Sequence, residues 1–196
     1  MFAITLCAAG CGRHAISGSS LCFEHQADRG RETARIIGLI AQGGATADLV
    51  ADGMVFDGVD FSERSFSGCA FRRARFKGCA FSRLVVRSCF FDFAEFENCV
   101  FEKSDFNFVS FAGARFIDCE FFEAEIIHTN FLGAGLRKTS FRDSNLYNSR
   151  FICADMEEAI FSNCNVTRVH FLESRREKVS FKSSNTADAI FVEESE

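Results

Sequence analysis

The 196-residue sequence contains no proline, no tryptophan and a single tyrosine, but 26 phenylalanines. Ordinary globular domains do not show this bias, which indicates a structural unit repeated along the chain. The longest uncharged opening stretch, residues 1–12, is too short to span a bilayer, so no membrane segment is predicted. The pattern of a secretory signal is also missing, which favours a reducing, cytoplasmic setting for the ten cysteines.

Positive charge and catalytic groups are scarce as well. The formal net charge is −5, so affinity for nucleic acid along the whole chain is not expected. None of the four histidines lies in a motif with a nucleophile or a paired carboxylate. The sequence therefore predicts a protein that is not an enzyme.

Apolar residues recur at every fifth position from Phe56 to Phe191. Of these 28 positions, 20 are Phe and six are Val, Ile, Leu or Met, and only Arg176 and Thr186 break the rule. We call each of these 28 positions a centre. The residue two before a centre is Ala, Cys, Ser, Thr or Val in 25 of the 28 cases. A five-residue period fits neither an α-helix nor a β-strand, so it describes an architecture with two inward positions in every five residues.

This grid resembles the tandem A-[D/N]-[L/F]-x-x motif of the pentapeptide-repeat family. The resemblance implies an all-β solenoid, a right-handed quadrilateral β-helix with four pentapeptides per coil and about seven coils. Residues twenty apart then stack in columns, and the columns that begin at Phe61 and Phe71 are entirely Phe. Matching triplets are Ser104-Asp105-Phe106, Thr129-Asn130-Phe131, Ala154-Asp155-Met156, Cys164-Asn165-Val166 and Ser184-Asn185-Thr186.

A second cysteine pattern precedes the repeats. The set Cys7-x3-Cys11-x10-Cys22-x2-His25 has the paired spacing of a tetrahedral zinc site, and its second half resembles short treble-clef-like zinc knuckles. Four protein ligands close the coordination shell, so we predict a structural zinc, with His14 as the reserve ligand. The alternative is three unrelated thiols and a surface histidine.

Three segments follow from these patterns. Residues 1–27 are the zinc-binding module, residues 28–51 a helical cap and linker, and residues 52–196 the β-helix. In the cap we expect Asp28 as the helix N-cap and a second short helical turn around residues 46–51. Helical spacing is seen in Ala34, Ile37, Ile40 and Ala41. The helix is expected to end at the pair Gly43-Gly44.

Charges on the outward positions form bands. Residues 64–87 hold seven Arg or Lys and no acid, whereas residues 88–125 hold nine acids and only two bases. Such a band can steer a charged partner, although runs of charge are more often solvated surface. The candidate basic patch consists of Arg72, Arg73, Arg75, Lys77, Arg83 and Arg87.

One outward column is apolar, and exposed strips of that kind usually contact another molecule. Self-association, a protein partner or a chance arrangement all explain it. The strip consists of Leu132, Ile152, Leu172 and Val192, and a second patch is expected from Phe90, Phe93, Phe108 and Phe122.

The function that these patterns favour is binding to a protein partner. The resemblance to pentapeptide-repeat proteins implies a bacterial binder of DNA gyrase or topoisomerase IV that imitates the shape and charge of DNA, although the basic band departs from a DNA-like surface. The alternatives are a structural scaffold that acts as a homodimer, and nucleic-acid binding assisted by the zinc module.

Overall fold

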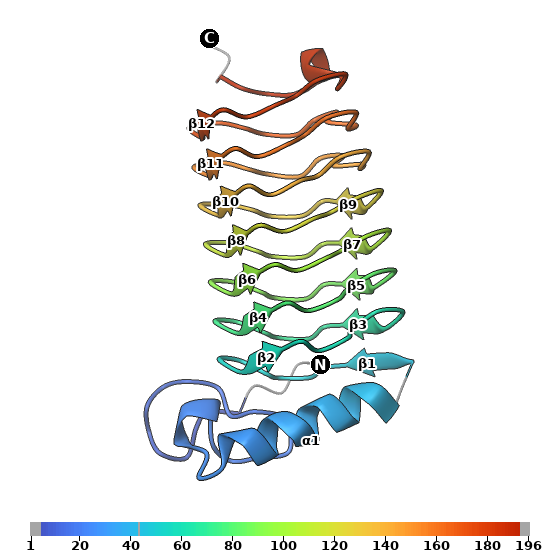
Figure 1. Ribbon diagram of the computed structural model, residues 1–196. Coiled ribbons are helices and arrows are strands. Elements are labelled where there is room, and N and C mark those ends of the chain that lie inside the picture. Colours follow the sequence, from blue (N-terminus) through green and yellow to red (C-terminus); the bar gives the residue numbers. More distant parts are fainter. Residues whose placement is uncertain (1–4, 43, 193–196) are drawn as a thin grey trace.

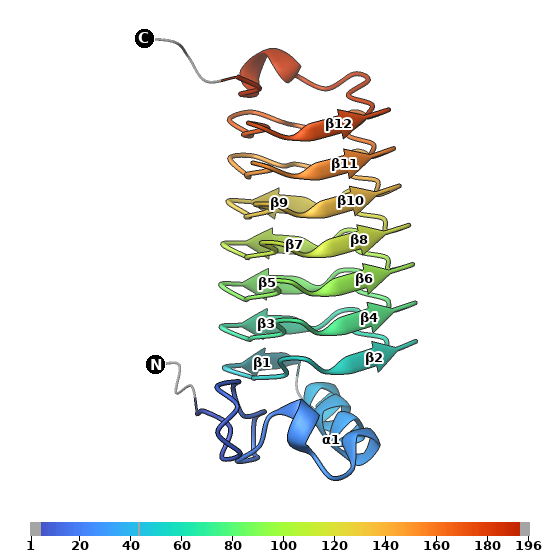
Figure 2. The same cartoon turned by 90° about the vertical axis from the view of Figure 1, so that its left-hand side faces the viewer.

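The computed structural model describes residues 5–42 and 44–192 and shows a four-sided β-solenoid standing on an N-terminal helix (Figure 1). In Figure 2 the strands of the near side run to the right, and the chain climbs from the N-terminal to the C-terminal end, so the coil is right-handed. The predicted quadrilateral β-helix of about seven coils is confirmed.

The described strands are three residues long and form two parallel sheets, β1-β3-β5-β7-β9 and β2-β4-β6-β8-β10-β11-β12. Their bounds are β1 Ala45–Ala47, β2 Val55–Asp57, β3 Ser65–Ser67, β4 Arg75–Lys77, β5 Val85–Arg87, β6 Glu95–Glu97, β7 Asp105–Asn107, β8 Arg115–Ile117, β9 Glu125–Ile127, β10 Gly135–Arg137, β11 Asp155–Glu157 and β12 Arg175–Glu177. Paired strands are offset by twenty residues, and single bridges with the same offset join the coils on the other two sides.

We name the four sides by their inward residue in the second coil, in chain order the Phe66, Phe71, Phe76 and Phe81 faces. The two sheets form the Phe66 and Phe76 faces, and the Phe71 and Phe81 faces lie opposite each other. On the latter two, the all-Phe columns predicted from the sequence form continuous ring stacks. The twenty-residue period of the sequence is therefore the period of one coil.

The core consists of phenylalanine rings in contact along and across the columns. The ring of Phe96 is parallel to those of Phe76 and Phe116, with centroids 4.8 and 4.7 Å away, and it meets Phe101 edge to face at 5.6 Å. Each such pair adds about 0.5–1.5 kcal/mol to what burial of the rings contributes. The stacking thereby holds successive coils in register.

Small donors occupy the second inward position. The Sγ atoms of Cys79, Cys99 and Cys119 each lie 3.5 Å from the backbone carbonyl 23 residues earlier, to which they donate. Serine makes the same bond, as Ser149 Oγ donates to the Ile126 carbonyl at 2.9 Å. Contact between thiols raises the pKa of Cys99 to about 12 and lowers that of Cys119. These thiols pack at the second inward position of the five-residue grid, and the structure adds their bonds to the backbone.

The chain turns each corner two residues after an inward centre, with that residue in the left-handed conformation from Asp48 to Ser183. Glycine adopts this conformation without steric cost, and Gly58 and Gly78 do so here. Two corners hold phenylalanine instead, Phe93 at φ 58° and Phe108 at φ 56°. A bulky side chain in that region costs about 1–3 kcal/mol. The fold therefore gains nothing from phenylalanine at these two corners.

The helix α1 (Arg29–Gln42) closes the lower end of the solenoid (Figure 1). Asp28 is its N-cap, as predicted, and accepts a hydrogen bond from the Arg31 N–H at 2.9 Å. Among the described residues, no helix is long and apolar enough to cross a bilayer. Gly43, which we expected to end the helix with Gly44, lies outside the described residues.

The buried stripe of α1 differs from the predicted one. Ile36 and Ile40 are buried and join the core, Ile37 is half-buried, and Ala34 and Ala41 are exposed. An i, i+4 pair of isoleucines buries more apolar area than a stripe that includes two alanines, which sets the rotation of the helix.

The expected second helical turn around residues 46–51 was wrong. Strand β1 lies there and pairs in parallel with β3, with Thr46 beside Phe66. Thr46 and Ala51 therefore continue the five-residue grid below Phe56, so solenoid structure begins inside the segment that we expected to be cap and linker. The grid was harder to see here because neither centre is a large apolar residue.

The upper end closes with a short 3-10 helix, η2 (Thr186–Asp188), over rings that are half-buried. Arg176, which breaks the grid, is exposed, and its guanidinium lies 5.0 Å from the centroid of Phe191. Arg176 thus replaces an apolar centre of the Phe76 face, and its cation–π contact covers Phe191, the last ring of the neighbouring Phe71 column.

We expect Phe96→Ala to lower the free energy of unfolding by about 3–5 kcal/mol, because it leaves a cavity among stacked rings. Phe93→Ala in the same coil is the matched control and should change it by less than about 1 kcal/mol, since that side chain is outward and strained. Urea titrations followed by circular dichroism measure both. Equal losses would show that the inward column does not hold the coils together.

Candidate metal centre and binding surfaces

Cys7, Cys11, Cys22 and His25 converge in the N-terminal module, with their ligand atoms all within 4.8 Å of one another. The Nδ1 atom of His25 lies 3.4 Å from the Sγ atoms of Cys7 and Cys22, and the Sγ atoms of Cys11 and Cys22 are 3.7 Å apart. Ligands of a tetrahedral zinc lie about 3.5–3.8 Å apart, given zinc–sulfur and zinc–nitrogen bonds of roughly 2.3 and 2.0 Å. The four side chains therefore fit such an ion.

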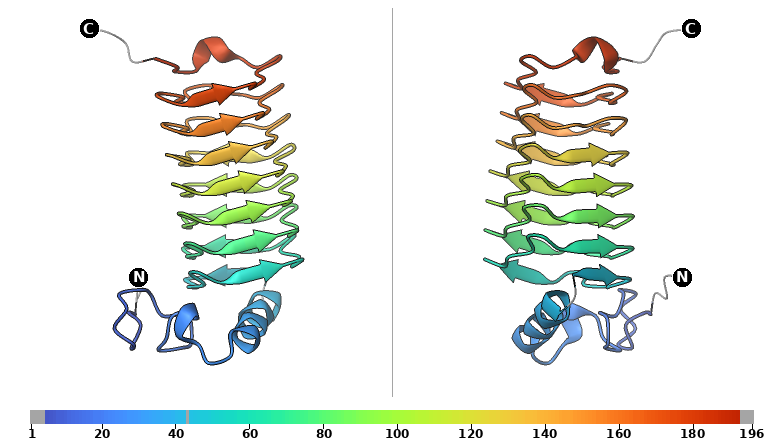
Figure 3. Two further views of the ribbon diagram at one scale, coloured as in Figure 1. Left: turned by 60° about the vertical axis from the view of Figure 1, so that its left-hand side comes forward. Right: turned by 90° about the vertical axis from the view of Figure 1, so that its right-hand side faces the viewer.

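Local backbone structure brings the four ligands together. The 3-10 helix η1 (Phe23–His25) places His25 beside Cys22, whose carbonyl accepts the His25 N–H at 3.1 Å. A bridge between Leu6 and His14 and a turn with left-handed Gly10 and Gly12 fold the first half back on itself. Figure 3 shows this module beside α1 and below the first coil.

The thiols differ in their protonation. A backbone hydrogen bond from Cys22 lowers the pKa of the Cys7 thiol to about 6, so that Cys7 is mostly a thiolate at neutral pH. Burial raises the pKa of Cys22. A bound cation would favour the thiolate form of all three cysteines, and metal uptake would release protons.

His14 does not join the four ligands and instead connects the module to the solenoid. Its Nδ1 atom lies 2.8 Å from Oδ2 of Asp52, which is also 3.5 Å from the Arg72 guanidinium. Arg72 in turn lies 3.8 Å from Asp92 in the next coil. We call the four side chains of His14, Asp52, Arg72 and Asp92 the polar ladder. They are largely shielded from solvent, so the polar ladder fixes the module against the first coils of the Phe71 face.

The six cations of the predicted basic patch are spread over all four faces, and five of them pair with acids. The acid comes from an adjacent coil in each case: Arg72 with Asp52 and Asp92, Arg75 with Glu95, Lys77 with Glu97, Arg83 with Glu63 and Arg87 with Asp105. Arg73 has no ion pair within the described residues. Four cations of the basic band thus pair with acids of the acidic band across coil boundaries.

The predicted apolar strip lies on the upper half of the Phe71 face. Leu132 and Val192 are 45% and 74% exposed, and Ile152 and Leu172 are half-buried. Hydrogen bonds between the backbones of neighbouring coils place Ile152 beside Leu132 and Leu172 beside Ile152. These four side chains therefore form one column on the surface.

The off-grid phenylalanines do not form one patch. Phe122 lies on the Phe81 face, opposite the others, whereas Phe90 lies on the Phe71 face. Phe93 and Phe108 occupy the two corners that border the Phe71 face and are 58% and 65% exposed. The Phe71 face is thus where the unusual outward residues gather.

One of these corners holds an aromatic cluster that the sequence pattern did not single out. The ring of Phe108 stacks on His128 with centroids 5.0 Å apart, and His128 meets Tyr147 edge to face at 5.9 Å. We call these three residues the aromatic corner. The twenty-residue step from Phe108 to His128 was the available signal, but only the coil geometry shows that Tyr147 leans toward them.

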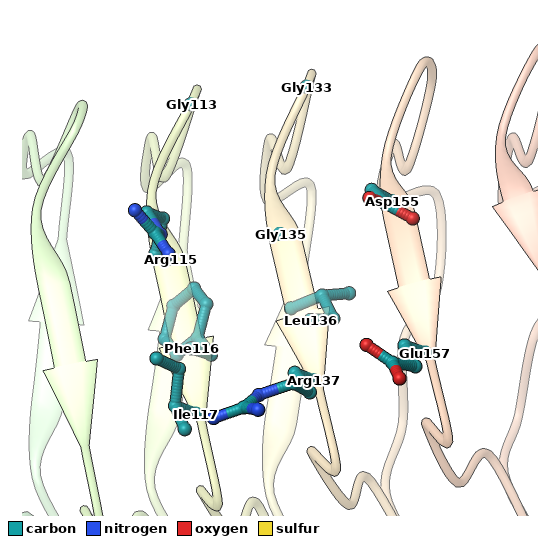
Figure 4. Close-up of a pocket in the computed structure, with 10 residues that line it drawn as sticks. All are labelled: Gly113, Arg115, Phe116, Ile117, Gly133, Gly135, Leu136, Arg137, Asp155 and Glu157. Atoms are coloured by element: carbon teal, nitrogen blue, oxygen red, sulfur yellow. The ribbon is translucent and has the colours of Figure 1, made fainter.

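A hollow of about 650 Å³ lies on the Phe76 face across β8, β10 and β11 (Figure 4). It arises because Gly135 has no side chain between Arg115 and Asp155. Arg137 and Glu157 complete the charged rim. Charges of both signs surround this hollow, so it does not define one class of ligand.

Comparisons with known proteins agree with the repeat. A family model described as pentapeptide repeats matches residues 55–92 and 129–168 in eight copies, which supports the pentapeptide-repeat interpretation. No curated protein sequence matches the chain.

Solved structures of similar shape include a trypsin-treated variant of QnrB1, a plasmid-mediated fluoroquinolone resistance protein. It is 20% identical, the match covers 76% of this chain and 82% of that chain, and the TM-score is 0.48. HetL, a pentapeptide-repeat protein involved in heterocyst differentiation regulation from the cyanobacterium Nostoc, is 12% identical, with 81% and 96% covered and a TM-score of 0.34.

We expect Asp52→Ala to loosen the module, because His14 and Arg72 then lose a shielded carboxylate worth about 1.5–3 kcal/mol. Hydrogen exchange of residues 5–27 should become faster. Glu97→Ala removes an exposed partner of Lys77 and serves as the control, with an effect below about 1 kcal/mol. Unchanged exchange in Asp52→Ala would mean that the polar ladder does not hold the module.

Proposed function

We propose that this protein is a non-enzymatic scaffold that binds a protein partner through the Phe71 face. That face carries the apolar strip and is bordered by the aromatic corner, so apolar and aromatic groups lie together on a rigid surface. Exposed apolar strips and aromatic side chains are typical of protein interfaces.

The observation that carries this proposal is the conformation of Phe108. Its side chain is 65% exposed, and its backbone is left-handed at φ 56°, where a phenylalanine is unfavourable. Neither burial nor the turn requires an aromatic residue there, since other corners hold glycine, asparagine or charged residues. Strained residues of this kind are retained at sites where the side chain is needed for function.

The interior supports binding rather than catalysis. Among the described residues, the buried polar side chains are two threonines and three serines, and each hydroxyl donates to a backbone carbonyl. Burial raises the pKa of Cys164 to about 11, which keeps that thiol protonated at neutral pH. Hydroxyls that donate to backbone carbonyls and a protonated thiol supply neither an acid–base pair nor an activated nucleophile.

A type II topoisomerase is the candidate partner that the pentapeptide-repeat resemblance suggests, and QnrB1 is described as a fluoroquinolone resistance protein. Ion pairs of opposite sign run between coils, as between Arg75 and Glu95 or Lys77 and Glu97. The surface is therefore not uniformly negative like DNA. Binding through the apolar and aromatic groups of the Phe71 face fits these charges better than pure charge mimicry.

The protein at micromolar excess is expected to inhibit gyrase supercoiling or to relieve its inhibition by a quinolone, and Phe108→Ala should weaken the effect about tenfold or more. Stability should stay within about 1 kcal/mol of the parent because the side chain is outward. Glu120→Ala, an exposed change on the opposite Phe81 face, is the control.

Absence of any effect on gyrase, and on topoisomerase IV in the matching decatenation assay, would rule out a type II topoisomerase as partner. Self-association through the strip is the competing role, and light scattering separates the two. A parent dimer that Ile152→Glu converts to a monomer, without an effect on gyrase, would replace the proposed partner by a second copy of the chain.

We further propose that Cys7, Cys11, Cys22 and His25 hold a structural zinc. Their spacing of 3.4–3.7 Å supports this, and four protein ligands leave no open position for catalysis. Bound zinc would contribute folding energy to a module whose buried apolar side chains are few, among them Ile16 and Phe23.

The purified protein is expected to contain one zinc ion per chain by native mass spectrometry. Cys22→Ser should lose the ion and unfold the module at a lower temperature, while the solenoid keeps its β signal. Cys153→Ser removes an exposed thiol far along the solenoid and should retain the zinc. A parent that takes up no zinc from an equimolar solution would contradict the proposal.

A further inference from the structure

A cleft of about 570 Å³ lies between the N-terminal module and the first coils. Neither part forms it alone, since the module supplies one wall and the corner between the Phe71 and Phe76 faces the other. Its lining includes five arginines and two carboxylates: Arg13, Arg29, Arg72, Arg73, Arg75, Glu24 and Asp52. The cleft is therefore positively charged in a chain whose net charge is −5.

The two carboxylates, together with Glu95 beside Arg75 and Asp92 beside Arg72, cancel only part of this charge. Asp52 is held between His14 and Arg72, and Glu24 lies 3.4 Å from Arg29. Arg13 and Arg73 have no ion pair within the described residues and remain available to an anion. Arginine side chains bind phosphate oxygens through two parallel hydrogen bonds, so this lining suits a phosphate ligand.

Exposed aromatic rings border the arginines. The guanidinium of Arg73 lies 5.5 Å from the ring centroid of Phe93, and that of Arg72 lies 4.8 Å from Phe90. Phe93 is 58% exposed at a strained corner, and its ring lies across Gly113, where a Cβ atom would come within 2.6 Å of it. Gly113 thus leaves room for an outward ring that the fold does not need.

We propose that this cleft binds a short segment of single-stranded nucleic acid, with phosphates on the arginines and a base on Phe93. Arginines next to exposed aromatic rings are the combination that binds single strands, because phosphates take the charge and bases stack on rings. The acidic remainder of the solenoid disfavours a long duplex, which would lie along Glu95 and Glu97 as well. An acidic peptide would use the arginines but not the ring.

This inference is independent of the proposed function. The apolar strip and the aromatic corner lie higher on the solenoid and do not line the cleft. A variant in the cleft can therefore lose nucleic-acid binding while its effect on gyrase is unchanged, and the reverse holds for Phe108→Ala.

The test uses the full chain and a fluorescent single strand of about ten deoxythymidines, followed by anisotropy. Arg29 and Arg75 have only exposed ion pairs, so phosphates can contact them as well as Arg13 and Arg73. With these four arginine contacts, affinity should fall on the order of 50-fold between about 50 and 200 mM salt. The double variant R13E/R73E should halve that salt dependence and lose most of the affinity. Phe93→Ala should weaken binding about fivefold or more through lost stacking.

The matched control is R142E/R150E, which makes the same change of charge at exposed arginines outside the cleft and without ion pairs among the described residues. It should bind nearly as the parent does. Equal losses in the two double variants, or no binding by the parent, would overturn the site. Competition by poly-glutamate as strong as by the single strand, or no effect of Phe93→Ala, would overturn the assignment to nucleic acid.

Discussion

Contact between phenylalanine rings twenty residues apart is the interaction on which the rest of this structure depends. Rings of successive coils lie nearly parallel at 4.3–5.2 Å, close to the spacing of paired β-strands, so stacking and backbone pairing require the same register. A slip by one pentapeptide would place one column of side chains beneath another and mismatch their shapes. The strands are only three residues long because the chain turns a corner every five residues.

A core built in this way separates stability from function. Inward positions are occupied by rings and small donors, which leaves the outward positions and corners free to vary. Five of the six cations of the basic patch pair with an acid from an adjacent coil, which explains why the run of positive charge in the sequence does not produce a continuous positive surface. What remains after this pairing is concentrated on and around the Phe71 face, in the strip, the aromatic corner and the arginine cleft.

The N-terminal module completes the lower end of that face. His14 binds Asp52 rather than joining the metal ligands, and Ile16 and Phe23 share the hydrophobic core with α1 and the first coil. A metal that stabilises the module would therefore also hold the wall of the cleft in place. Phe93 and Phe108, the two strained aromatic corners, border the same face at different heights, which places the two proposed binding sites on one rigid support.

The sequence alone showed the five- and twenty-residue periods and the Cys7, Cys11, Cys22 and His25 set, and its resemblance to pentapeptide repeats implied the solenoid, because these features depend on local spacing along the chain. Its errors arose where local pattern was weak: Thr46 and Ala51 resembled a helical turn, and Ala34 and Ala41 resembled a buried stripe. Tertiary structure decided which charges are neutralised and which residues share a surface. Arg13 and Arg73 are sixty residues apart in the chain, and only the docking of the module on the first coils brings them into one cleft, because contacts between distant segments leave no periodic signal.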